Sequence, residues 1–291
     1  QLSNWWRAEW NLVAAMKQRI GAAAAFDCVQ QTLKTSGEKL PSSAKIRLMW
    51  LRAQLSLDLE EVQSTPAFVD EVLEMISHYS GLGDDPFETI RAQAMLTKGQ
   101  ALLRLAKVDE SFSVFLSIRQ EYPKTEQAAL SYLLEANHHS ANNHLTEAQR
   151  NLVTLAERFP ESKYAPRALY EASINAERRG LPESLQEAVR LLEVLATRFP
   201  SSDLLFFARL RQGHMLRNLN DFGAALEVYE EILRNEIFEE HPDRSLASLS
   251  RADCLFAIAR TDSSKILEAA DRFGDLFLLG NLPVDLRVEA G

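Results

Sequence analysis

The 291-residue sequence has few cysteines, no excess of basic residues and no long apolar run. Its two cysteines, Cys28 and Cys254, stand near opposite ends of the chain, so no disulfide framework is expected and the compartment stays open. The formal net charge of −9 disfavours a nucleic-acid partner, which would need clustered lysine and arginine. Because no uninterrupted apolar stretch reaches about 18 residues, we expect no transmembrane helix.

Motifs of catalytic sites are also missing. The sequence contains no nucleophile elbow, Walker loop, HExxH, CxxC or EF-hand loop. The best metal candidates are His138, His139 and His144, but adjacent histidines on a helix point about 100° apart, and we interpret them as a solvated helix end. We therefore predict that the chain is not an enzyme and has no cofactor or metal site.

One pattern of residue spacings occurs twice in the middle of the chain, and each copy is called a unit. Its first copy has landmarks spaced by 12, 4 and 8 residues at Gly99, Ser111, Phe115 and Pro123. The second copy repeats these spacings at Ala136, Ala148, Leu152 and Pro160. Small residues let two helices approach closely, the large residue fills the space between hairpins, and the proline ends the second helix. The unit predicts a helical hairpin, and Thr125 and Ser162 are predicted to cap the helices that follow the prolines.

This pattern resembles the tetratricopeptide repeat, a family of helical hairpins with a period of 34 residues. The endings "EYPKT", "RFPES" and "RFPSS" at 121–125, 158–162 and 198–202 are similar to those of bacterial cell-envelope members. The resemblance implies an all-α, right-handed superhelical solenoid of antiparallel helix hairpins. It also favours the bacterial periplasm or cell envelope over the cytoplasm.

The pattern extends over most of the chain, and we predict a single solenoid over residues 1–291. Hairpins are expected at about 3–35, 44–80, 88–121, 125–158, 162–198, 203–235 and 243–279, with a truncated stub at 283–291. Trp6 and Trp10 are expected to pack within the array, and Asp85 to cap a helix that begins at Pro86. Because neither end has a polar cap, the array is interpreted as a fragment.

In this family the first helices of successive hairpins line a concave surface that binds peptides or partner helices. Carried over to this sequence, the binding candidates are Gln100, Arg104, Asn137, Tyr170, Arg178, Phe207, His214 and Arg217. The amide and guanidinium groups are suited to a peptide backbone or carboxylate, and the two aromatic rings to apolar anchors. Leu96 and Leu133 stand where a carboxylate clamp of the family has lysine, so recognition of chaperone tails is not expected.

These observations predict a non-catalytic scaffold that binds protein segments on its concave face. The alternative is an architectural helical arm of a larger envelope enzyme or assembly, with its catalytic part elsewhere. A third possibility, a peptide-sensing regulator, would carry a DNA-binding helix-turn-helix, and none is visible. The partner and the oligomeric state stay open.

Overall fold

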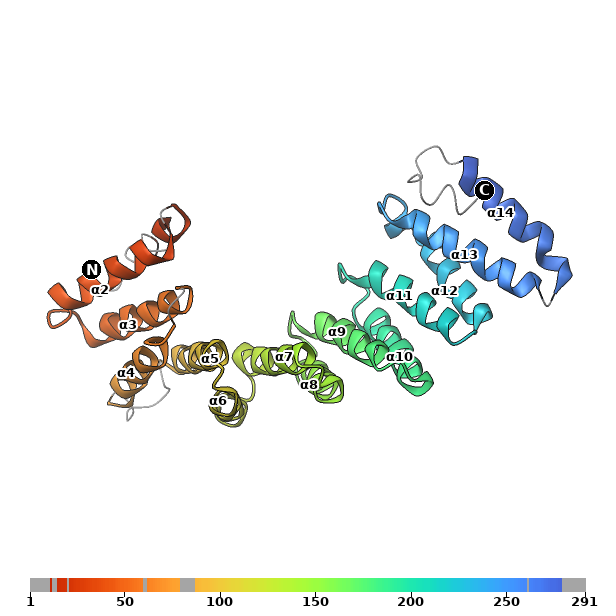
Figure 1. The fold of residues 1–291 in the computed structure, drawn as a ribbon. Coiled ribbons are helices and arrows are strands. Elements are labelled where there is room, and N and C mark those ends of the chain that lie inside the picture. Colours follow the sequence, from red (N-terminus) through yellow and green to blue (C-terminus); the bar gives the residue numbers. More distant parts are fainter. Residues whose placement is uncertain are drawn as a thin grey trace. The chain divides into compact units, whose positions relative to one another are not determined.

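The computed structural model describes residues 11, 15–19, 21–59, 62–78, 87–260 and 262–278. Within these ranges the chain forms α-helices and two short 3-10 helices, with no strand (Figure 1). The predicted all-α class is therefore confirmed. Trp6, Trp10, Asp85, Pro86 and the stub predicted at 283–291 lie outside the described residues.

The chain divides into two compact units, residues 1–135 and 136–291, with the boundary inside α7 (Glu126–Ala141). The first unit contains α2 (Ala22–Ser36), α3 (Ser42–Leu57), α4 (Thr65–Ser77), α5 (Glu88–Arg104) and α6 (Val108–Glu121). The second contains α8 (Leu145–Arg158), α9 (Ala165–Arg178), α10 (Pro182–Arg198), α11 (Leu205–Asn218), α12 (Phe222–Arg234), η1 (Glu236–Phe238), α13 (Arg244–Ala259), η2 (Ser263–Lys265) and α14 (Ile266–Leu278).

Within each unit, neighbouring helices pack as antiparallel pairs (Figure 1). We call α3, α5, α7, α9, α11 and α13 first helices, and α4, α6, α8, α10, α12 and α14 second helices. First helices of successive hairpins also touch, as α3 touches α5 and α11 touches α13. Helix α2 begins directly after Gly21, and its first residues are small alanines.

Large and small side chains fit together inside the hairpins. A Cβ atom added at Gly99 would overlap the ring of Phe115, and one added at Gly213 would lie 2.5 Å from Cε1 of Tyr229. Each ring thus lies against the first helix of its own hairpin, whereas the sequence pattern placed it between hairpins. The close approach of the two helices at the small residue is confirmed.

Four hairpins also share a turn that the sequence pattern did not reveal. The turn residue after the first helix has a positive φ in each: 58° at Ala106, 62° at Asn143, 68° at Gly180 and 60° at Asn220. In three of them the next amide donates to a carbonyl five residues earlier, as His144 N does to His139 O at 2.8 Å. This closes the last helical turn and allows the second helix to start at once.

The prolines end the second helices as predicted. Helices α6, α8 and α10 stop two residues before Pro123, Pro160 and Pro200. Thr125 Oγ1 accepts a hydrogen bond from Ala128 N at 3.2 Å and caps α7. The prediction for Ser162 was wrong in position: its hydroxyl accepts from Tyr164 N at 3.3 Å, within the turn before α9.

Candidate functional site

Two hollows open between successive first helices of the second unit. The α7–α9 hollow has a volume of about 440 Å³ and is lined by Asn137, Ser140, Ala141, Arg167, Glu171, Ile174, Asn175 and Arg178. The α9–α11 hollow has a volume of about 430 Å³ and is lined by Glu177, His214, Met215, Arg217, Asn218 and Phe222. The structure thus brings together two predicted pairs, Asn137 with Arg178 and His214 with Arg217.

In the α7–α9 hollow, Arg178 reaches back to the carboxyl end of α7. Its Nη1 donates to Ser140 O at 3.2 Å and to Ser140 Oγ at 2.9 Å. Ser140 Oγ in turn donates to Oδ1 of the buried Asn175 at 2.7 Å. Since the last carbonyls of a helix lack partners within it, a cation there is favourable. Arg178 therefore joins one first helix to the next.

The charges of the α9–α11 hollow are also paired. Arg211 Nη2 lies 2.6 Å from Glu177 Oε2 across α9 and α11, and Arg217 Nη2 lies 3.0 Å from Asp253 Oδ2 across α11 and α13. Both pairs are only partly exposed, so they are screened less than surface pairs. They leave the hollow polar but electrically balanced.

His214 lies on α11 between these two ion pairs. Burial lowers the pKa of its imidazole, Arg217 and Arg211 lower it further, and Glu177 opposes them. The ring is therefore neutral at neutral pH, with one donor and one acceptor nitrogen. Its Nε2 lies 3.5 Å from Ser250 Oγ on α13, a weak contact that a ligand group can replace.

The two candidates in the first unit lie on α5. Arg104 donates from Nη1 to Leu57 O and from Nη2 to Leu59 O at 3.0 Å. It thus holds the carboxyl end of α3, as Arg178 holds that of α7. Gln100 is half-buried one turn earlier on α5.

Neither predicted aromatic anchor lines the α7–α9 or the α9–α11 hollow. Tyr170 is half-buried, and the guanidinium carbon of Arg211 lies 5.7 Å from its ring centroid. Phe207 is 39% exposed and packs edge-on against His241, with centroids 5.4 Å apart. The apolar lining comes from other residues, Ile174, Met215 and Phe222. Among the polar residues that line the hollows, Asn218 could have been predicted from the sequence, because it lies one helical turn after His214.

In the described part of the chain, no group of three His, Cys, Asp or Glu side chains is arranged to hold a metal ion. No helix there is long and apolar enough to span a bilayer. Cys28 and Cys254 are free thiols, and burial raises the pKa of Cys254 to about 11. A thiol with such a pKa is a poor nucleophile.

Comparisons with known proteins agree with this fold. Residues 210–273 match the family model described as tetratricopeptide repeat. No curated protein sequence matches the chain. A solved structure of the C-terminal part of a tetratricopeptide repeat-containing protein from Cytophaga hutchinsonii is similar, with TM-score 0.61 and 9% identity over 96% of this chain and 98% of that one.

The apo form of RapI is also similar, with TM-score 0.56 and 10% identity over 98% of this chain and 97% of that chain. At these identities the likeness concerns the fold alone. The family match begins within α11 and ends within α14, and the same hairpin recurs through the described residues. The described residues therefore have the fold of tetratricopeptide-repeat solenoids.

Proposed function

We propose that the chain is a non-catalytic scaffold that binds an extended protein segment across the α7–α9 and α9–α11 hollows. Tetratricopeptide repeats generally serve as protein-interaction scaffolds and are typically non-catalytic. The observation that carries the proposal is the position of the hollows, which open between consecutive first helices and contain Asn137, Arg178, His214 and Arg217.

The charges in the hollows favour a particular ligand chemistry. Arg178 bonds to Ser140, Arg211 to Glu177 and Arg217 to Asp253, so a carboxylate clamp would have to break existing contacts. Among the described polar groups that line the hollows, the amides of Asn137 and Asn218 take part in no such contact. Amides both donate and accept, which matches the peptide backbone. The ligand is therefore a backbone-presenting segment with apolar side chains that reach Ile174, Met215 and Phe222.

A matched pair of variants tests this proposal. A peptide of about twelve residues is selected from a random display library on the wild-type chain, and its affinity is measured by calorimetry. Ile174→Arg fills the α7–α9 hollow with a charged side chain and should weaken binding by about tenfold or more. Val194→Arg makes the same change on the exposed side of α10 and should leave affinity unchanged. Equal affinities for the two variants would refute the proposal.

The contacts of Arg104 and Arg178 favour a second candidate, the architectural arm. Both side chains join consecutive first helices through carbonyl groups, which stiffens an array without any ligand. An arm predicts that the display library yields no specific peptide, while Arg104→Ala and Arg178→Ala each lower the melting temperature. Selection of a peptide that distinguishes Ile174→Arg from Val194→Arg would exclude the arm as the sole function.

A further inference from the structure

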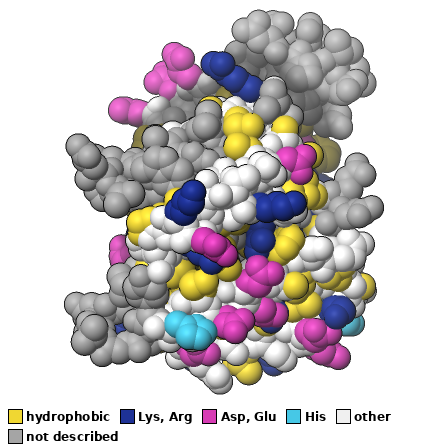
Figure 2. Space-filling view, turned by 90° about the vertical axis from the view of Figure 1, so that its left-hand side faces the viewer, with side chains coloured by type: hydrophobic (Ala, Val, Ile, Leu, Met, Phe, Trp, Pro, Cys, Tyr) yellow, Lys and Arg dark blue, Asp and Glu magenta, His cyan; other side chains and the backbone are white. Residues whose placement is uncertain are grey.

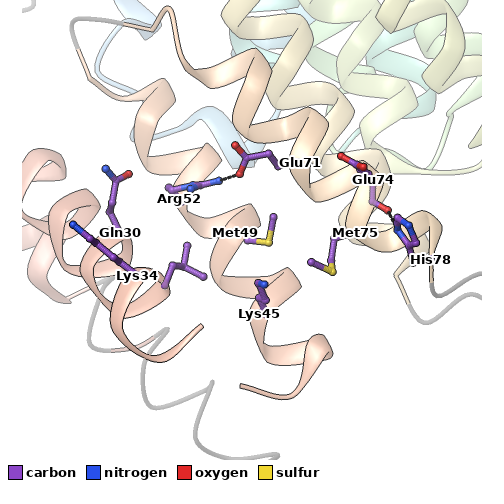
Figure 3. A pocket seen from close by; sticks show the side chains of 10 residues that line it. Gln30, Lys34, Lys45, Met49, Arg52, Glu71, Glu74, Met75 and His78 are labelled. Carbon is purple, nitrogen blue, oxygen red and sulfur yellow. Dashed lines mark hydrogen bonds and ion pairs between the residues drawn. The ribbon is translucent and has the colours of Figure 1, made fainter. Parts of the chain in front are cut away.

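A larger groove lies in the first unit, over α3 and between α2 and α4 (Figure 3). We call it the α2–α4 groove. Its volume is about 540 Å³, within the range of ligand-binding pockets. The floor is apolar: Met49 is 7% exposed, and Leu33 and Met75 pack against the same core cluster. Unbranched methionine side chains adapt to ligands of different shapes.

At the end of the groove that Arg52 lines, an aromatic contact joins α2 and α4. The rings of Phe26 on α2 and Phe68 on α4 lie 5.9 Å apart, and the guanidinium carbon of Arg52 lies 4.1 Å from the Phe68 ring centroid. Arg52 also forms an ion pair with Glu71. From Phe26 to Lys34 the wall formed by α2 extends about 12 Å, which accommodates about four residues of an extended chain.

At the other end of the groove, the basic side chains lie on α2 and α3 and the acidic side chain lies on α4. Lys34 on α2 and Lys45 on α3 form no ion pair with any carboxylate of the described residues, and both line the groove. Glu74 and His78 lie on α4, where His78 Nδ1 is 2.8 Å from Glu74 O. Figure 3 shows the lysines on the side of α2 and α3 and the Glu74–His78 pair across the methionine floor. A ligand with one acidic end therefore fits in one direction.

We propose that the α2–α4 groove binds a short acidic protein segment, with one large apolar side chain on the Met49–Met75 floor and carboxylates at Lys34 and Lys45. Pairing with these lysines breaks no ion pair formed among the described residues. Figure 2 views the molecule from the side of α2–α4 and shows basic, acidic and apolar side chains interspersed on this face. Among the coloured side chains of that face no broad basic surface, as nucleic acid would need, is seen, whereas a two-lysine site suits a segment with few carboxylates. This site does not depend on the hollows of the second unit.

Methionine methyl groups provide a direct test. The chain, labelled with ¹³C-methyl methionine, is titrated with the peptide acetyl-Glu-Glu-Leu-Phe-Ser-Ser-amide and followed by NMR. The methyl signals of Met49 and Met75 should shift and saturate, while those of Met95 and Met215, which do not line this groove, should stay in place. Shifts of equal size at Met215, or equal binding of acetyl-Lys-Lys-Leu-Phe-Ser-Ser-amide, would overturn the proposal.

Charge-reversal variants complete the test. Lys34→Glu with Lys45→Glu should weaken binding of the acidic peptide about tenfold or more, because attraction becomes repulsion. The matched variant Lys39→Glu with Lys124→Glu changes the net charge equally at lysines outside the groove and should bind like wild type. Circular dichroism confirms that both variants fold. If Met49 and Met75 shift with protein concentration alone, the occupant is a second copy of the chain, and the acidic-segment proposal is wrong.

Discussion

The hairpins α5–α6 and α11–α12 share the packing of a glycine against an aromatic ring but differ in the polar groups beside it. In both, a glycine on the first helix faces an aromatic ring on the second, Gly99 with Phe115 and Gly213 with Tyr229. Both rings are fully buried. They differ in their polar groups: Ser111 Oγ donates to Gly99 O at 2.8 Å in the first hairpin, whereas Ala225 occupies that position in the second.

The α7–α8 hairpin uses another combination at the same positions. Ala136 replaces the glycine and Leu152 the aromatic residue, and both are buried. A larger residue on the first helix thus accompanies a smaller one on the second. The difference shows that the two side chains together fill one space of fixed volume. The size of the side chain at one position therefore limits the size at the other.

The largest effect is expected from breaking that volume match. Gly99→Ala and Gly213→Ala each place a methyl group against a buried ring, and we expect each to lower the free energy of unfolding by about 1–3 kcal/mol. This reverses the usual gain of up to about 1 kcal/mol for glycine to alanine within a helix. Urea denaturation followed by circular dichroism measures both.

Two controls accompany this prediction. Gly223 is exposed on α12, and a methyl group there meets no atom closer than 3.9 Å, so Gly223→Ala should be neutral or stabilising. Gly99→Ala combined with Phe115→Leu recreates the combination of α7–α8 and should recover part of the loss. If the double variant is as unstable as the sum of its single variants, the two positions are not coupled.

Removing the polar groups in which the two hairpins differ should change stability less. Ser111→Ala removes the hydrogen bond to Gly99 O and should cost about 1 kcal/mol. Tyr229→Phe should cost nothing or stabilise, since its buried hydroxyl makes no hydrogen bond of good geometry. Burial raises the pKa of Tyr229, while Ser250 and Arg217 act against this rise. A destabilised Tyr229→Phe variant would show that these two neighbours bind the hydroxyl in solution.

The pairing of a small residue with a large one could be predicted from the sequence, because the two residues are close together in the chain. Gly99 and Phe115 are 16 residues apart within one hairpin, and their spacing repeats. The roles of Arg104 and Arg178 could not be predicted from the sequence, because both donate to backbone carbonyl groups 38–47 residues away and every residue type has a carbonyl. The same holds for the α2–α4 groove, where Phe26 and Phe68 come into contact although they lie 42 residues apart in the sequence. The binding residues stay a prediction.

The smallest effect concerns the residue that follows each glycine, Gln100 in α5 and His214 in α11. The pKa of His214 is lowered, by burial first and then by Arg217 and Arg211. As the pH falls below about 6.5, the unfolded chain gains a proton that the folded chain does not bind, so stability decreases until the pH passes the folded pKa. His214→Gln makes α11 resemble α5 and should flatten this decrease between about pH 7 and pH 5. Denaturation curves at several pH values measure the slope, and identical slopes for wild type and variant would mean that the folded imidazole titrates like a free one.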